Sequence, residues 1–179
     1  MAAFPTKVGV DERLTRPYLV FPNTSSERRE YVPIGWLASD VIANQKLRIL
    51  PDATLGEFAL LTSTMHMAWM RAITGRLESR YMYSVGVCYN TFPTPPKNSD
   101  LTKLEPLAKA VLDARAAHPD STLADLYDPN LMPPNLRKAH QALDRAVDLL
   151  YSRKGFTSER ERVEHLFMSY EKIRAHRCK

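Results

Sequence analysis

Residues 54–84, TLGEFALLTSTMHMAWMRAITGRLESRYMYS, decide the fold of the first half of this 179-residue chain. Thr54 followed three residues later by Glu57 is typical of a capping box, and apolar residues then recur at helical spacing as far as Ile73. Gly75 supplies a C-terminal stop. The pattern predicts one long helix between these two signals. Because apolar residues lie on most of its faces, we expect this helix to be buried on most sides.

The segment after this helix alternates with a period of two residues, which is typical of a strand. Successive side chains of a strand point to opposite faces. One face has Glu78, Arg80 and Met82, and the other has Tyr81, Tyr83 and Val85. We expect the aromatic face to pack against the protein, whereas the charged face must meet solvent or a ligand.

Elements on either side of this stretch are predicted from similar signals. Short runs rich in β-branched and aromatic residues, separated by turn residues, predict strands at 17–21, 31–37 and 46–50. Capping residues and apolar stripes predict helices that begin at Thr102 with Glu105, at 122–127, at Pro133–Pro134, and at Ser158 with Glu161. The fold is therefore predicted to be α+β, a mixed strand and helix module followed by an antiparallel helical bundle. The proline-rich stretch FPTPPK at 92–97 divides the two, which predicts domains at 1–92 and 93–179.

The composition excludes several classes of protein. The formal net charge is +5, from 25 Lys and Arg against 20 Asp and Glu, and the basic residues are spread along the chain. Cys88 and Cys178 are too few for a disulfide framework and have no metal-ligating neighbours at ligand spacing, so we expect a reducing, cytoplasmic environment and no metal site. Neither a signal-peptide core nor a run of about 18 apolar residues occurs, so we expect no membrane span. The glycines are too widely spaced for a phosphate-binding loop, which favours a binding module over a self-sufficient enzyme.

Two groups of charged residues are candidates for contacts with nucleic acid. Arg28 and Arg29 could bond to phosphate oxygens, which position a protein on DNA without recognising its sequence. Glu78 could accept from the exocyclic amine of cytosine and Arg80 could bond to guanine in the major groove, so one strand face could recognise both members of a C·G pair. The alternatives are a solvated loop for the first group and a surface ion pair for the second.

Other polar and aromatic residues have simpler interpretations. The methionine and tryptophan stripe formed by Met65, Met67, Trp69 and Met70 indicates core packing rather than a cofactor pocket. His66 is expected to be an ordinary buried histidine, and Tyr81, Tyr83 and Tyr89 are expected to pack against a sheet rather than to stack on a base. Pro51–Asp52 with Glu57 suggests a metal-dependent nuclease only weakly, because the expected Glu-x-Lys motif is missing.

Three long blocks of sequence resemble the C-terminal end of MmeI-type DNA methyltransferases and type IIL restriction-modification enzymes. The blocks are SSERREYVPIGWL (25–37), LPDATLGEFALLTSTMHMAWMRAITGRLESRYMYS (50–84) with the following YNTFPTPP (89–96), and LAKAVLDARAAHPDSTLADLYDPNLMPPNLRKAHQALDRAVDLLYSRKGF (107–156). They occur in the order and at the spacing of the family, and the resemblance extends from about Ser25 to Tyr170.

The resemblance implies which functions this chain has. In the family, a nuclease and an adenine-N6 methyltransferase domain precede a target recognition domain and a helical C-terminal domain, and this chain resembles only the later part of the recognition domain with the helical domain. The methyltransferase motif Asn-Pro-Pro-Tyr, the S-adenosylmethionine loop and the nuclease residues have no counterpart here. The resemblance thus implies no catalysis and no cofactor for this chain alone. It implies double-stranded DNA and a catalytic methyltransferase domain, in cis or in trans, as partners, with S-adenosylmethionine bound in the full-length family.

The resemblance also implies which residues recognise bases. Family specificity positions match Glu78 and Arg80, the pair that the alternation had distinguished. Relatives often have Lys and Asp there, an exchange of charge that fits a change of the recognised base from cytosine to guanine on one strand. Met82 matches a further position, often Arg in relatives, where its apolar side chain would contact a base without a hydrogen bond. Other base-recognising residues of the family lie in the loop that here includes Gln45 and Lys46.

We therefore interpret the chain as the sequence-recognising module of a DNA adenine methyltransferase or restriction-modification enzyme. In this interpretation the arginines bind phosphates, Glu78 and Arg80 recognise a base pair, and the helical bundle braces the module. An alternative from another class is a non-catalytic helical scaffold, or protein-interaction module, that does not bind DNA. Methyl transfer by the isolated chain is a third hypothesis.

Overall fold

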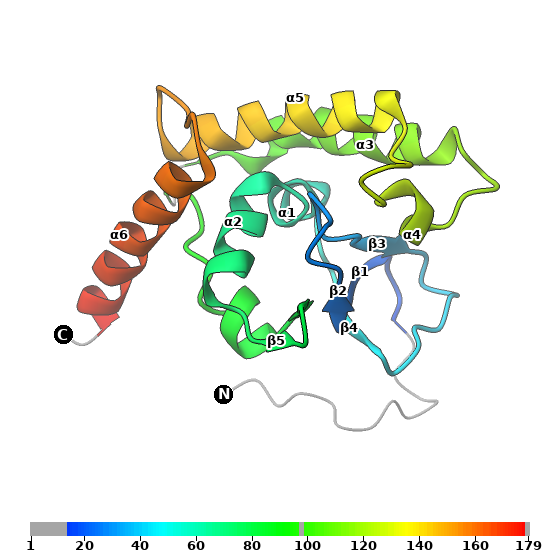
Figure 1. Ribbon diagram of the computed structural model, residues 1–179, viewed down its shortest axis with the longest axis horizontal. Helices are drawn as coiled ribbons and strands as arrows, with labels where there is room; N and C mark the ends of the chain where they lie inside the picture. Colours follow the sequence, from blue (N-terminus) through cyan, green and yellow to red (C-terminus); the bar gives the residue numbers. More distant parts are fainter. Residues whose placement is uncertain (1–13, 97–98, 178–179) are drawn as a thin grey trace.

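The computed structural model describes residues 14–96 and 99–177 and shows an α+β fold, as the sequence predicts (Figure 1). One antiparallel sheet has the order β3-β1-β4, formed by β1 (Tyr18–Pro22), β3 (Gly35–Leu37) and β4 (Leu47–Leu50). A smaller antiparallel sheet has the order β2-β6-β5, formed by β2 (Thr24–Ser25), β5 (Arg76–Leu77) and β6 (Arg80–Met82). The two sheets are adjacent, since only Asn23 separates β1 from β2.

The strand predictions are confirmed in place, and one of them is too long. The predicted strand at 31–37 begins only at Gly35. Pro33 lacks the backbone N–H that a strand ladder needs. Around it the chain instead makes a tight turn, in which the backbone N–H of Ile34 donates to the carbonyl of Val32 at 2.8 Å. Val32 and Ile34 are nevertheless buried, so their apolar side chains belong to the core without belonging to the sheet.

The single helix predicted over 54–75 is wrong, because the structure has two helices, α1 (Leu55–Leu61) and α2 (Thr64–Ile73). The capping box of Thr54 and Glu57 is confirmed at the start of α1. Ser63 interrupts the helix because its side chain caps α2, accepting from the backbone of His66. The second helix ends at Ile73, with Thr74 rather than Gly75 as the extended cap residue.

Gly56 allows α1 to approach the start of the helical half closely. A Cβ atom at this position would lie 2.8 Å from the carbonyl oxygen of Leu101. We expect Gly56→Ala to lower the free energy of unfolding by about 1–2 kcal/mol, because this overlap outweighs the better helix propensity of alanine. Urea unfolding checks the effect. Gly75→Ala is the matched control, with no atom within 4 Å of the added Cβ, and destabilisation as large as that of Gly56→Ala would contradict the proposed overlap.

The second half is helical, as predicted. A π-helical turn, η1 (Val85–Tyr89), precedes the proline-rich stretch, and a 3-10 turn, η2 (Leu101–Leu104), follows it. The main helices are α3 (Glu105–Ala116), the short α4 (Leu123–Leu126), α5 (Pro134–Tyr151) and α6 (Glu159–Arg177). The predicted capping box of Thr102 and Glu105 is wrong, since Asp100 is the cap and accepts from the Thr102 N–H at 3.0 Å. The predicted start of α5 at the two prolines is confirmed.

The last helix packs differently from the predicted three-helix bundle. Helices α3 and α5 run antiparallel, side by side, whereas α6 turns away from them and packs on α2 (Figure 1). The Trp69 ring of α2 lies 5.1 Å from the ring of Phe167 and 5.7 Å from that of Tyr170, centroid to centroid. Aromatic contacts at these distances are favourable. The C-terminal helix therefore stabilises the first half of the chain directly.

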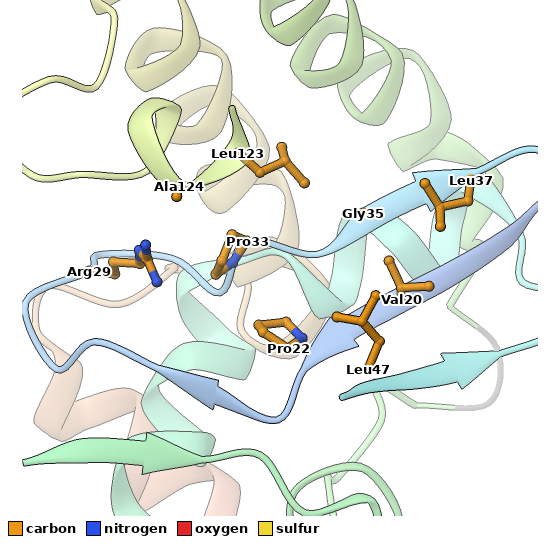
Figure 2. A pocket seen from close by; sticks show the side chains of 9 residues that line it. All are labelled: Val20, Pro22, Arg29, Pro33, Gly35, Leu37, Leu47, Leu123 and Ala124. Carbon is orange, nitrogen blue, oxygen red and sulfur yellow. The ribbon is translucent and has the colours of Figure 1, made fainter. Parts of the chain in front are cut away.

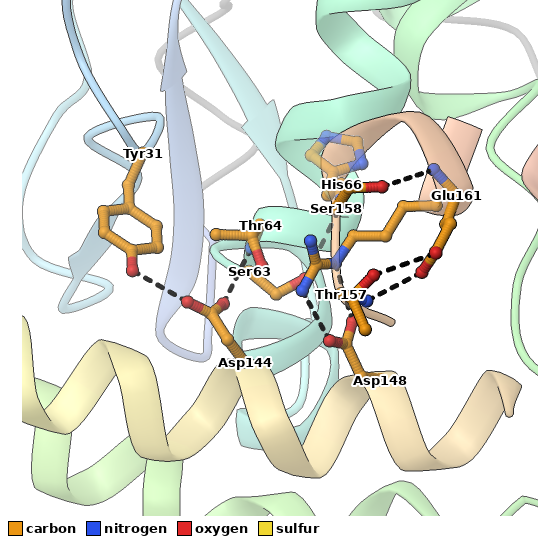
Figure 3. A network of polar contacts seen from close by, with 10 residues as sticks. Tyr31, Ser63, Thr64, His66, Asp144, Asp148, Thr157, Ser158 and Glu161 are labelled. Atoms are coloured by element: carbon orange, nitrogen blue, oxygen red, sulfur yellow. Dashed lines mark hydrogen bonds and ion pairs between the residues drawn. The ribbon is translucent and has the colours of Figure 1, made fainter. Parts of the chain in front are cut away.

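Buried polar residues of α5 also join the two halves (Figure 3). Asp144 accepts from the Tyr31 hydroxyl at 2.7 Å and from the Thr64 N–H at 2.8 Å. One turn further along α5, Asp148 pairs with Arg162 at 2.6 Å and so holds α6 to α5 within the second half. Buried residues on both sides of the proline-rich stretch form one hydrophobic cluster, which includes the buried, free Cys88; Cys178 lies outside the described residues.

Candidate nucleic-acid interface

The hairpin of β5 and β6 presents the charged pair that the sequence distinguishes. Strand β6 pairs with β5 so that Arg80 faces Leu77 across the ladder. Arg80 and Met82 are exposed, whereas Tyr81 and Tyr83 are buried, which confirms the predicted alternation over these four residues. The prediction that Glu78 belongs to the same strand is wrong, because Glu78 lies in the hairpin turn with a φ of 58°.

The turn conformation affects what Glu78 can do. A non-glycine residue in this left-handed region carries backbone strain of roughly 1 kcal/mol, and such strain is often found at functional sites. The Oε2 atom of Glu78 lies 3.5 Å from Nη2 of Arg80, and the two side chains are 76% and 59% exposed. An ion pair this long and exposed contributes little to stability, so both charged groups are available to a ligand.

Arg76 is a hairpin residue that the sequence patterns do not distinguish. Its guanidinium lies 4.5 Å from the centroid of the Tyr81 ring and donates to the carbonyl of Ser79 at 3.3 Å. Glu27, in the turn after β2, also contacts the hairpin. Hydrogen bonds to the Glu27 carboxylate from its own backbone and from the Ser79 side chain, together with the positive charges of Arg28 and Arg76, lower its pKa. Arg76 and Glu27 therefore both bond to Ser79 of the turn. Only the hairpin brings these residues together, so the sequence spacing alone contains no signal for the contact.

Strand β2 places Arg28 and Arg29 close to the hairpin. The pairing of β2 with β6 sets Thr24 opposite Met82, and the chain then turns so that the Arg29 N–H donates to the Ser26 carbonyl at 3.2 Å. Arg28 is exposed. Arg29 is half-buried, so the two arginines have different surroundings.

Arg29 lies at the edge of an apolar groove of about 370 Å³ between the first sheet and α4 (Figure 2). The other residues that line this groove are Val20, Pro22, Pro33, Gly35, Leu37, Leu47, Leu123 and Ala124. Figure 2 shows Arg29 at one end of the groove, on the chain segment that leads to Pro33.

The loop with Gln45 and Lys46 is joined to the hairpin through Asn23. The Asn23 N–H donates to the Lys46 carbonyl at 3.3 Å, and the Asn23 carbonyl accepts from the Tyr83 N–H at 2.9 Å. Asn44 orders the end of the loop, since its side-chain oxygen accepts from the Lys46 N–H at 2.9 Å. Gln45 and Lys46 are both exposed. Asn23, between the two sheets, thus joins two segments that are far apart in the sequence.

The residues interpreted as core are in the core. The side chains of Met65, Met67, Trp69 and Met70 are all fully buried. His66 is buried beside them with its Nε2 atom 2.9 Å from the Tyr83 hydroxyl. Tyr81 and Tyr83 are likewise buried, so the expectation that they pack rather than stack on a base is confirmed.

The structure gives no support to the weak nuclease pattern. The carboxylate of Glu57 accepts from the Thr54 N–H at 2.7 Å and thereby serves the helix cap. Within residues 14–96 and 99–177, no group of three or more His, Cys, Asp or Glu residues could hold a metal ion. Over the same ranges, no helix is long and apolar enough to cross a membrane.

Comparisons with known proteins agree with this arrangement. The model of the MmeI target recognition domain matches residues 1–96, and that of the MmeI C-terminal domain matches residues 95–176. DNA methyltransferase A of Bacillus subtilis (strain 168) is 37% identical over 174 residues, which cover 97% of this chain and 20% of that protein. A solved structure of the type IIL restriction-modification enzyme MmeI in complex with DNA is similar with a TM-score of 0.84 and 45% identity, covering 91% of this chain and 22% of that one. The chain spans about a fifth of the length of these relatives, and it belongs to the MmeI family, with matches to both its target recognition domain and its C-terminal domain.

Proposed function

We propose that this chain recognises a specific base sequence in double-stranded DNA, as the recognition module of a DNA adenine-N6 methyltransferase or restriction-modification enzyme. The observation that carries the proposal is the exposed carboxylate and guanidinium of Glu78 and Arg80, side by side on a hairpin of a target recognition domain. The similar solved structure of MmeI is a complex with DNA, which supports duplex DNA as the ligand.

The residues have complementary roles in this proposal. Arg80 donates to the O6 and N7 atoms of guanine, and Glu78 accepts from the N4 amine of cytosine. Met82, which is 44% exposed, contacts a neighbouring base through its apolar side chain, while Gln45 and Lys46 hydrogen-bond to bases from the adjoining loop. Two further basic residues, Arg28 and Arg29, bind phosphates and fix the position of the module on the duplex.

Catalysis is proposed to lie outside this chain. The chain covers a fifth of a relative named as a DNA methyltransferase, and its 179 residues do not include the Asn-Pro-Pro-Tyr motif. A methyltransferase domain, in cis or in trans, would bind S-adenosylmethionine and transfer the methyl group to the adenine that the module selects. We further propose that the chain acts in the cytoplasm, and that it divides into a recognition domain at 1–92 and a helical domain at 93–179. The junction of the two family matches at 95–96 supports this division.

A salt titration tests the proposal. We expect the chain to retain duplexes of random sequence at low salt, and the logarithm of the association constant to fall linearly with the logarithm of the salt concentration. Arg28→Ala should reduce this slope by about 0.9, because the variant neutralises one phosphate fewer. Fluorescence anisotropy between about 50 and 300 mM salt measures both quantities.

Lys109→Ala is the control for this titration. It removes the same charge from α3, where Lys109 is exposed and pairs with Asp113 at 2.7 Å, so it should leave the slope unchanged. If the chain retains no duplex even at the lowest salt, the alternative of a scaffold without DNA binding is preferred.

A further inference from the structure

Three consecutive residues after β2 are each bonded to a helix. The Arg29 carbonyl accepts from Nη2 of Arg71 on α2 at 3.0 Å. The Glu30 carboxylate pairs with Arg137 of α5 at 2.6 Å. The Tyr31 hydroxyl donates to Asp144, also on α5, at 2.7 Å. The backbone just after Arg28 is therefore fixed from the helical side of the molecule.

Arg71 connects this segment to the C-terminal helix. While one end of its guanidinium donates to the Arg29 carbonyl, the other end pairs with Glu159, the first residue of α6. These two side chains are 25% and 49% exposed. A pair with this exposure contributes little to overall stability, so breaking it should leave the chain folded.

The segment lies between the helices and the recognition hairpin. On its other side, β2 pairs with β6, the strand that contains Arg80 and Met82. Within the turn, the Arg28 N–H donates to the Ser26 hydroxyl and the Arg29 N–H donates to the Ser26 carbonyl, while the Glu27 carboxylate bonds to the Ser79 side chain of the hairpin. The hairpin therefore holds this turn from one side, and the helix contacts of residues 29–31 hold it from the other. Among these helix contacts, that of Arg71 is made to the backbone, at the residue next to Arg28.

We infer that Arg71 and Glu159 are positioning residues for the phosphate contacts of Arg28 and Arg29. Through this pair, the C-terminal helix α6 contributes to DNA binding without contacting the recognised bases. The inference rests on the proposed function of the hairpin and adds to it a role for a helix in the other half of the chain. A planar guanidinium suits this role, because it can donate to a carbonyl and to a carboxylate at the same time.

Interference by phosphate ethylation tests the inference, using the 179-residue chain and a duplex selected by it from a random library. Comparison of the unchanged chain with Arg28→Ala identifies the phosphates that Arg28 contacts. Arg71→Met is expected to show no interference at these same phosphates and to have a salt slope that is smaller by about 0.9 per phosphate. Its preference at the C·G pair should stay unchanged, because the hairpin is intact.

The chain provides a matched control on α6. Arg160→Met removes the same charge and breaks a similar exposed pair with Glu164, but Arg160 has no contact with the Arg29 segment, so the interference pattern should be unchanged. If Arg71→Met fails to fold, Glu159→Gln replaces it, with Glu164→Gln as its control. In this second experiment, the inference is supported if Glu159→Gln shows no interference at the phosphates that Arg28 contacts.

The outcomes separate this inference from the proposed function. If the unchanged chain gives no interference and no salt-dependent binding, the proposed function fails and the inference fails with it. If interference at some phosphates disappears in Arg28→Ala but persists in folded Arg71→Met and Glu159→Gln, only the inference is overturned. It is also overturned if Arg28→Ala gives the same interference pattern as the unchanged chain.

Discussion

A chain with both Glu78→Lys and Arg80→Asp is expected to select duplexes in which one C·G pair has become G·C. The exchange moves the cation to the turn position and the carboxylate to the strand position of the hairpin, where Glu78 and Arg80 now lie with their charged atoms 3.5 Å apart. Lysine donates to guanine and aspartate accepts from cytosine, so the order of the two recognised bases is reversed. The net charge of the chain stays the same, so non-specific binding should change little.

The expected effect is large. A well-formed contact to the correct base discriminates by about 1–3 kcal/mol, which corresponds to roughly 5–150-fold in binding. Because the exchange removes the old preference and introduces the new one, the ratio of affinities for the two duplexes should change by about 100-fold or more. Selection from a random library identifies the base pair, and competition between the two selected duplexes measures the ratio.

A matched exchange on α6 serves as the control. Arg160→Asp with Glu164→Lys makes the same substitutions at an exposed ion pair of 2.8 Å and should leave the selected sequence unaltered. If the hairpin variant is folded and still selects the unchanged sequence, Glu78 and Arg80 do not recognise that base pair. The alternative of a surface ion pair would then be correct.

Acid should destabilise the protein, because the fully buried His66 accepts a proton less readily in the folded state than in the unfolded state. Burial lowers the pKa of His66 from its usual 6.5 to about 3. The folded state therefore binds this proton less readily than the unfolded state does. The stability associated with neutral His66 is fully present above pH 6.5 and is lost as the pH falls toward 3.

The expected loss of stability is roughly 1.4 kcal/mol per pH unit from His66 over this range. His140 acts in the same direction, since burial and the neighbouring Arg115 lower its pKa well below the usual value. Asp144 opposes them, because burial raises the pKa of its carboxyl and favours its protonated form in the folded state. Urea unfolding at pH values from 7 to 4 measures the sum of these effects.

Two variants isolate the part due to His66. His66→Gln keeps a hydrogen-bonding group near the Tyr83 hydroxyl and should reduce the acid dependence by about 1.4 kcal/mol per pH unit. His118→Gln is the matched control, the same substitution at a partly exposed histidine that bonds to Asn135 at 3.1 Å. An unchanged pH dependence in His66→Gln would exclude His66 as the cause.

Sequence patterns predicted the elements whose causes are local. The capping box at Thr54, the prolines that begin α5 and the alternation through Arg80 and Tyr83 were all confirmed. In each case the signal and the structure involve residues within about one turn of helix or along one strand. The resemblance to the MmeI family was likewise contained in the sequence, in three long blocks.

Two errors arose where a distant residue decides the local structure. The helix break at Ser63 was missed because serine and threonine occur both inside helices and at their caps. Here Asp144, 80 residues further along the chain, accepts from the Thr64 N–H and satisfies the exposed start of α2. The packing of α6 on α2 was missed for a similar reason, since an apolar stripe does not identify its partner.

The sequence by itself determined the α+β class, the start of most helices, the core stripe and the family of this protein, because capping, periodicity and motif spacing are properties of neighbouring residues. Tertiary structure alone placed Glu78 in a turn, joined the loop at Lys46 to the hairpin through Asn23, and connected α6 to the arginine segment through Arg71. The last two features depend on bonds between residues tens of positions apart, and such bonds form only when burial of the common core brings the segments together.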